Sequence, residues 1–76
     1  MKLYLGSHLS WYVPGQVSQM EIRLAESVSL MKLLAQLGLP STEIAIAAVN
    51  GGLVRLADTQ VTDGDRVEFH PPVGGG

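Results

Sequence analysis

Cysteine is absent from this 76-residue sequence, which excludes disulfides, a thiolate metal site and a thiol nucleophile supplied by the chain itself. Lysine and arginine number five, and they stand singly along a chain of net charge −2. The sequence therefore offers no basic stripe of the kind that binds nucleic-acid phosphates. We expect no direct contact with nucleic acid.

Long apolar runs are also missing. No run approaches the roughly 20 residues of a membrane span, and the first residues do not form a signal-peptide pattern. We expect a soluble protein of the cytoplasm that does not bind membranes.

The chain contains two histidines, His8 and His70. Neither has further ligands at a known metal-site spacing, and neither has a partner residue spaced for acid-base catalysis. Both are interpreted as surface residues. Neither histidine is therefore predicted to hold a metal or to act as a catalytic base.

Apolar residues are plentiful for a chain of this length. Hydrophobic residues make up 46% of the sequence and charged residues 16%. A chain this short is one small domain, which buries only about 60% of the surface that it exposes when unfolded. Some apolar side chains are therefore expected to stay on the surface, where they can contact a partner.

Two segments near the N-terminus alternate between apolar and polar residues, as strands do. Residues 2–6 place Leu3 and Leu5 on one face and Tyr4 on the other. Residues 19–25 alternate in the same way, so the two segments are predicted to pair as a hairpin.

The segment between these strands is irregular, and its Pro14-Gly15 pair indicates a turn. Trp11 lies in this segment. We expect Trp11 to close one end of the core, because a small domain can rarely leave its single tryptophan unused. The alternative is contact with a partner.

A leucine-rich stretch predicts a helix. The leucines are spaced i, i+3, i+4 and i+7, which places them on one helical face that packs on the sheet: they are Leu30, Leu33, Leu34 and Leu37. Ser27 or Ser29 can cap the start of this helix. Gly38 supplies its left-handed end, and Pro40 prevents its continuation.

The second half of the chain predicts three further strands. Residues 44–49 are apolar on both alternation phases, as in a strand that is covered on both faces or central in a sheet. The Asn-Gly-Gly segment at residues 50–52 is a hairpin turn that leads to a return strand at residues 53–56. The Asp-Gly-Asp turn at residues 63–65 precedes the last strand, at residues 66–70.

The predicted order of elements is β-β-α-β-β-β. The simplest fold for this order is an α+β domain over residues 1–70, with a mixed sheet of four to five strands and one main helix on one face. Alternation turns four side chains of the last three strands away from the helix: they are Leu53, Arg55, Glu68 and His70.

The remaining six residues form a predicted tail, Pro71-Pro72-Val73-Gly74-Gly75-Gly76. The prolines cannot donate hydrogen bonds to a sheet, and the glycines remove every side chain. Six extended residues reach at most about 20 Å, far enough to bring a carboxylate into a narrow channel of another protein. The alternative is a frayed chain end without a role.

Three local strings and the order of elements together resemble the ubiquitin-like β-grasp family of prokaryotic sulfur carriers. The strings are Ala48-Val49-Asn50-Gly51, Thr62-Asp63-Gly64-Asp65-Arg66-Val67-Glu68-Phe69 and the tail. The tail is most similar to the ending of the small subunit of molybdopterin synthase. The thiamine-pathway sulfur carrier shares the fold and the terminal Gly-Gly.

This resemblance implies a carrier that performs no catalysis. An ATP-dependent activating enzyme, using Mg²⁺, would adenylate the Gly76 carboxylate, and a sulfur donor would convert the product to a thiocarboxylate. Pro71, Pro72, Val73, Gly74 and Gly75 would position this terminus. The large subunit of molybdopterin synthase would then receive the sulfur, or thiazole synthase if the carrier serves thiamine synthesis.

The resemblance also implies a docking face for the activating enzyme, formed by Tyr4, Leu53 and His70 with Arg55 and Glu68 beside them. His70 departs from the aromatic residue that molybdopterin-type carriers tend to have there.

Two other functions fit the same fold. Ubiquitin shares the diglycine, so a modifier attached to lysines through Gly76 is one alternative, although the tail arginines of ubiquitin are absent here. A structural β-grasp module with an inert tail is the other.

Overall fold

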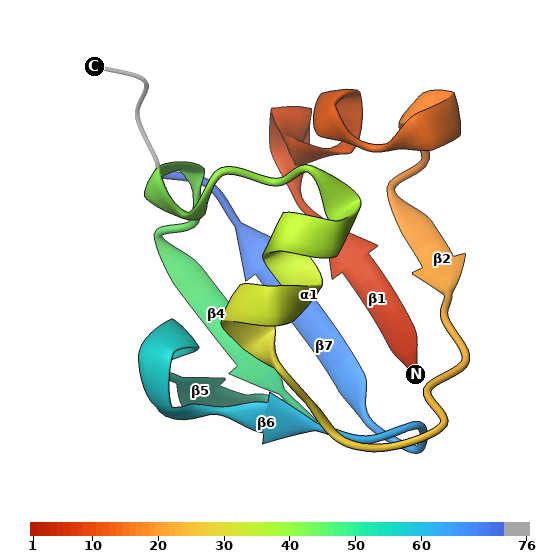
Figure 1. The fold of residues 1–76 in the computed structure, drawn as a ribbon. Coiled ribbons are helices and arrows are strands. Elements are labelled where there is room, and N and C mark those ends of the chain that lie inside the picture. The colour runs from red at the N-terminus through yellow and green to blue at the C-terminus, as the bar shows by residue number, and fades with distance from the viewer. Residues whose placement is uncertain (73–76) are drawn as a thin grey trace.

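A mixed sheet of five strands, crossed on one face by a main helix, forms the framework of residues 1–72, the part of the chain that the computed structural model describes (Figure 1). The strands are β1 (Lys2–Leu5), β2 (Gln19–Glu21), β4 (Ile46–Val49), β5 (Gly52–Val54) and β7 (Arg66–His70). Their order across the sheet is β2-β1-β7-β4-β5. This architecture confirms the predicted α+β β-grasp fold.

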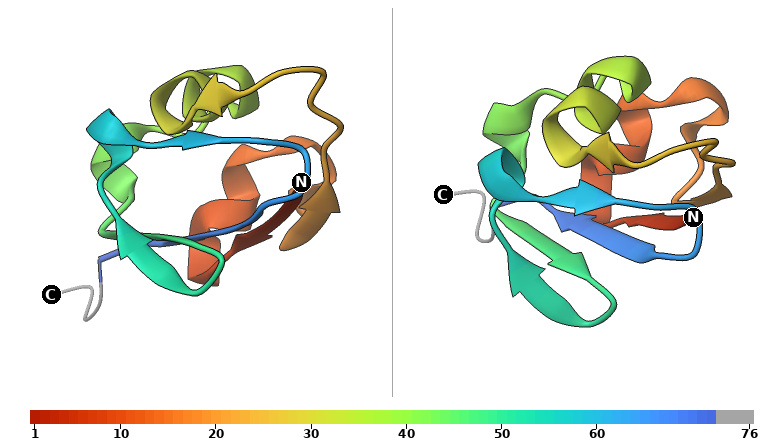
Figure 2. Two further views of the ribbon diagram at one scale, coloured as in Figure 1. Left: turned by 90° about the horizontal axis from the view of Figure 1, so that it is seen from below. Right: turned by 60° about the horizontal axis from the view of Figure 1, so that its bottom comes forward.

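The two central strands, β1 and β7, run parallel, with Leu3 opposite Val67 and Leu5 opposite Phe69. These four side chains alternate onto the face that meets the helix, and each is at least 98% buried. β1 also pairs antiparallel with β2, as predicted, and β7 pairs antiparallel with β4. Figure 2 shows from two further sides that the helix covers one face of the sheet.

The helix, α1, spans Leu30–Leu37 and begins and ends as its sequence predicts. The hydroxyl oxygen of Ser29 accepts a hydrogen bond of 3.1 Å from the backbone N–H of Lys32, which caps the first turn. Gly38 ends the helix in the left-handed region, at φ 76°. Leu30, Leu33 and Leu34 are buried against the sheet.

The strand predicted over residues 19–25 is shorter, because β2 ends at Glu21. Beyond it the backbone N–H of Leu24 donates to the Asp63 carboxylate at 2.8 Å, instead of to a neighbouring strand. Ile22 and Leu24 still pack against the core. The Asp63 carboxylate therefore takes the place of a neighbouring strand as the hydrogen-bond acceptor for Leu24, and the segment after β2 still buries the side chains that a strand would bury.

A second small sheet was not predicted. It pairs β3 (Val28–Ser29) with β6 (Gln60–Val61). Short 3₁₀ helices join the other elements: η1 (Ser7–Tyr12), η2 (Pro14–Gln16), η3 (Ser41–Glu43) and η4 (Leu56–Asp58).

The hairpin between β4 and β5 turns through Asn50 at φ 52° and Gly51 at φ 85°. This is the left-handed geometry that the Asn-Gly pair predicts. The return strand is shorter than residues 53–56, since β5 ends at Val54 and Leu56 begins η4.

The expectation that Trp11 closes the core is wrong. Its side chain is 70% exposed, whereas Leu9 and Val13 of the same segment are buried. The 3₁₀ turn of η1 directs these two smaller side chains inward, and they fill the end of the core without the indole.

The strand predicted at residues 44–49 corresponds to β4, which lies inside the sheet between β7 and β5, one of its two predicted arrangements, and is not covered on both faces. Ile46 is 41% exposed, because the face of β4 that carries it turns away from α1. Within residues 1–72, no helix combines the length and the apolar character needed to cross a membrane.

Candidate functional site

The face of the sheet opposite α1 carries most of the predicted docking residues. Strand pairing sets Tyr4 opposite Glu68, Glu68 opposite Ala48, and Ala48 opposite Leu53. Directly opposed residues share one face of a sheet, so this row crosses four strands. A second row, nearer the tail, sets Ile46 opposite His70. We call Tyr4, Ile46, Leu53, Glu68 and His70 the outer face.

The outer face exposes large apolar side chains. Leu53 is 78% exposed and Tyr4 is 37% exposed, in addition to Ile46. A small domain gains nothing in its own core from such side chains, and apolar groups clustered on one face are typical of a surface that meets another protein. Sequence reasoning missed Ile46, because the run that contains it is apolar on both alternation phases and does not show which face is exposed.

His70 is the last residue of β7 and lies at the end of this face from which the tail leaves. Its ring centroid is 5.7 Å from that of Tyr4 at an interplanar angle of 50°, and its Nε2 lies 3.9 Å from a Glu68 carboxylate oxygen. The ring also covers Gly6, where an added Cβ would stand 2.5 Å from His70 Nδ1. Gly6 therefore provides the space in which the histidine ring lies.

The tail begins where the sheet hydrogen bonds of β7 end. The backbone N–H of Gly6 donates to Phe69 O at 2.9 Å, and that of Ala45 donates to His70 O at 2.9 Å. Pro71 follows and has no N–H to continue the pairing. Pro71 is buried and Pro72 is exposed. The end of β7, from which the tail leaves, is thus held on two sides, by the segment after β1 and the segment before β4.

The predicted reactive terminus lies outside the described residues. This applies to four of the residues assigned to the tail, Val73, Gly74, Gly75 and Gly76.

Arg55 follows β5 and pairs with the carboxylate of Asp58 at 3.8 Å. It was predicted to flank the docking face. Both partners of this ion pair are largely exposed, so the pair contributes little to stability.

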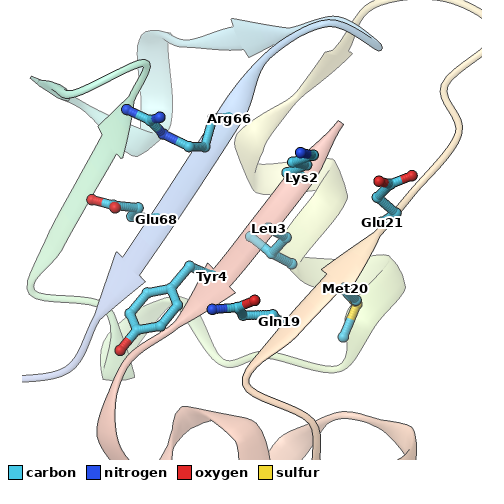
Figure 3. Close-up of a pocket in the computed structure, with 8 residues that line it drawn as sticks. All are labelled: Lys2, Leu3, Tyr4, Gln19, Met20, Glu21, Arg66 and Glu68. Atoms are coloured by element: carbon cyan, nitrogen blue, oxygen red, sulfur yellow. The ribbon is translucent and has the colours of Figure 1, made fainter.

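An open pocket of about 500 Å³ lies on the same side of the sheet, over β2, β1 and β7 (Figure 3). Its lining combines two basic side chains, two acidic ones and an aromatic ring. They are Lys2, Arg66, Glu21, Glu68 and Tyr4. Such a mixed lining fits a polar loop of a protein better than an anion such as phosphate.

Two carboxyl groups with shifted pKa values, those of Asp63 and Asp65, lie at the end of the sheet opposite the exit of the tail. The backbone N–H of Leu24 and then the N-terminal ammonium lower the pKa of Asp63. The backbone N–H of Thr62 and then the Asn50 side chain lower the pKa of Asp65. Hydrogen bonds to an ionised carboxylate favour its charged form. In the described part of the chain, no group of three His, Asp or Glu side chains is placed to hold a metal ion.

Comparison with known proteins adds two findings. The sequence profile of the ThiS family matches residues 11–76. Among solved structures, the NMR solution structure of a thiamine biosynthesis protein from Geobacter metallireducens is similar to this chain. The two are 29% identical, the match covers 100% of this chain and 88% of that one, and the TM-score is 0.56.

Proposed function

Because this chain belongs to the ThiS family of ubiquitin-like sulfur carriers, we propose that it carries sulfur as a thiocarboxylate on Gly76. Members of this family are small non-catalytic proteins that work with an activating enzyme and a synthase. The observation that carries the proposal is the family match, which extends through the tail to Gly76.

The chemistry requires activation, because a carboxylate anion neither accepts nucleophiles nor donates sulfur. A Gly76 oxygen would attack the α-phosphorus of ATP and displace pyrophosphate, giving an acyl-adenylate. A donor at the oxidation level of sulfide would then attack the acyl carbon and displace AMP. The product retains one oxygen and gains one sulfur.

ATP and Mg²⁺ belong to the partner in this scheme. The sequence contains no glycine-rich phosphate loop. Phosphoryl transfer of this kind depends on positioned cations. The activating enzyme is therefore proposed to supply both, and this chain to supply only the carboxylate.

The outer face is proposed to dock the activating enzyme. It offers Leu53, Tyr4 and Ile46 as apolar contacts and lies beside the exit of the tail. Its pocket of mixed charge would receive polar residues of the partner (Figure 3).

Two observations favour different sulfur acceptors. The ending Phe69-His70-Pro71-Pro72-Val73 followed by glycines resembles the small subunit of molybdopterin synthase, which favours transfer to a pterin precursor on the large subunit. The similar solved structure is described as a thiamine biosynthesis protein, which favours thiazole synthase. Incubating the thiocarboxylated protein with each acceptor enzyme decides between them.

The test of the carrier function is Gly76→Ala. A Cβ at the terminal residue would narrow the channel through which an enzyme reaches the carbonyl. Adenylation, measured as carrier-dependent exchange of pyrophosphate into ATP, should fall by about 100-fold or more.

Gly64→Ala is the matched control, because a Cβ at Gly64 meets no atom within 4 Å and its backbone is not left-handed. This variant should be activated as the unmodified chain is. Normal activation of Gly76→Ala would contradict the proposed function.

A further inference from the structure

Trp11 is a large apolar side chain held outward by a well-anchored segment. Its side chain is 70% exposed, while Leu9 and Val13, two residues to either side, are 0% and 3% exposed. The segment therefore cannot turn the indole inward without losing two core contacts. The exposed tryptophan is a fixed feature of this surface.

The backbone around Trp11 is also constrained. Ser7 and Gln16, at the two ends of the segment, have φ angles of 49° and 52°, a region that residues other than glycine rarely adopt. Between these two residues, the His8 ring packs against the Trp11 indole at a centroid distance of 5.7 Å. A side chain held in one place loses little entropy on binding, which favours a role as an interface anchor.

Trp11 lies at the end of the molecule from which the tail leaves. β1 and β7 are parallel neighbours, so η1, which follows β1, and Pro71, which follows β7, stand at the same edge of the sheet (Figure 1). His8 Nε2 lies 3.7 Å from a Glu43 carboxylate oxygen in η3. Two residues after Glu43, Ala45 is hydrogen-bonded to His70.

The length of the tail limits how far away a partner can be. Four residues follow Pro72, and four extended residues span at most about 14 Å. An enzyme that holds Gly76 in its reaction centre must therefore come close to this edge of the sheet. The surface around Trp11 is available for it to cover.

We propose that Trp11 is an anchor for the adenylating enzyme that receives the tail, inserting into an apolar recess of that enzyme. This inference rests on the proposed function and extends it to a second surface, beside the outer face. A chemical argument favours the adenylating enzyme over the sulfur acceptor as the partner of Trp11. The substrate of the adenylating enzyme still ends in an ordinary carboxylate, a group common to all proteins, so contacts with the body of the carrier add the recognition that the carboxylate itself does not provide. A sulfur acceptor can instead recognise the thiocarboxylate.

The test compares Trp11→Ala with Met31→Ala in the pyrophosphate exchange assay. Met31 is also exposed, at 43%, but lies in the first turn of α1, away from the tail. Loss of an interface tryptophan should raise the KM for the carrier about 10- to 30-fold with little change in kcat. The KM of Trp11→Phe should lie between those of the unmodified chain and Trp11→Ala. Met31→Ala should leave both KM and kcat unchanged.

A second measurement uses the unmodified side chain. Because the chain has one tryptophan, carrier labelled with fluorotryptophan gives a single ¹⁹F resonance, which should shift when unlabelled adenylating enzyme is added. An unmoved resonance would overturn the inference, and so would an unchanged KM for Trp11→Ala. Normal adenylation with impaired sulfur transfer would also overturn it, since the surface would then belong to the acceptor. Failure of the unmodified chain to be adenylated would instead overturn the proposed function and this inference together.

Discussion

His70 shows how a single side chain can shape the exit of the tail. Its ring lies over Gly6, beside Tyr4 and within 3.9 Å of Glu68. Gly6 has φ −77° and ψ 153°, angles open to any residue, so its glycine is required by space and not by backbone conformation. The packing of one ring on one glycine fixes the last residue of the sheet before Pro71.

Replacing Gly6 by alanine should therefore destabilise the protein through His70. The new methyl group would meet the ring at 2.5 Å and displace it, at a cost of about 1 kcal/mol in the free energy of unfolding. In a His70→Ala background the clash is absent, and alanine limits the freedom of the unfolded chain. There Gly6→Ala should be neutral or stabilising, by up to about 1 kcal/mol. Urea unfolding of the four proteins in this double-mutant cycle measures the difference. Equal costs in both backgrounds would mean that the His70 ring is not the reason for glycine at position 6.

Among the elements, the turn between β6 and β7 connects two other parts of the chain. Asp65 accepts hydrogen bonds from the backbone N–H of Thr62 at 2.8 Å and from Asn50 Nδ2 at 2.9 Å. Asn50 Oδ1 in turn accepts from the backbone N–H of Arg66 at 2.9 Å. This turn is thereby joined to the β4–β5 hairpin. Asp63 joins it to Leu24 and lies 3.5 Å from the N-terminal ammonium.

These contacts predict an acid-sensitive contribution to stability. Since folding lowers the pKa of Asp65, its contribution is present above the unfolded pKa of about 3.9 and is lost as pH falls through the lower folded value. Asp65→Asn should reduce the free energy of unfolding at pH 7. The difference between this variant and the unmodified protein should shrink as the pH falls below about 4. Chemical unfolding across pH 2–7 tests this, and a difference that is constant over the whole range would contradict it.

The elements also show what the sequence could and could not predict. The spacing of Leu30, Leu33 and Leu34, with Ser29 before and Gly38 after them, predicts α1 because its start, face and end are all encoded locally. The 3₁₀ turn that exposes Trp11 has no comparable periodicity. The early end of β2 depends on a carboxylate at Asp63, 39 residues from Leu24, and no local pattern contains such a contact.

The docking face was predictable in part. Strict alternation within residues 2–6 and 66–70 identifies Tyr4, Glu68 and His70, since each strand has one apolar and one polar face. In β4 every residue is apolar, so alternation cannot distinguish the exposed Ile46 from buried neighbours. The contact between the His70 ring and Gly6 depends on the register between strands, which the pattern of a single strand does not determine.

For the whole molecule, one sheet separates a core from a contact surface. α1 and the inward side chains of the strands form the core, and the outer face leaves Leu53 and Ile46 exposed on the side of the sheet away from α1. A charge at Leu53 should therefore impair docking without unfolding the protein.

Leu53→Asp should raise the KM for the carrier in the adenylation assay by about 10-fold or more. Its free energy of unfolding should change by no more than about 0.5 kcal/mol, because the side chain is 78% exposed. Met31→Asp, on the helix side, is the matched control and should be activated normally. If Leu53→Asp unfolds the protein or is activated as well as the control, this face is not the docking surface.

The carrier function depends on the chemical state of the terminus at Gly76. Mass spectrometry of the protein isolated from its native cells, followed by fragmentation of its C-terminal peptide, measures that state directly. We predict that a fraction of the molecules carries sulfur in place of one terminal oxygen of Gly76, and that this fraction vanishes in Gly76→Ala. A terminus found only as an unmodified carboxylate, or only joined to lysines of other proteins, would contradict it.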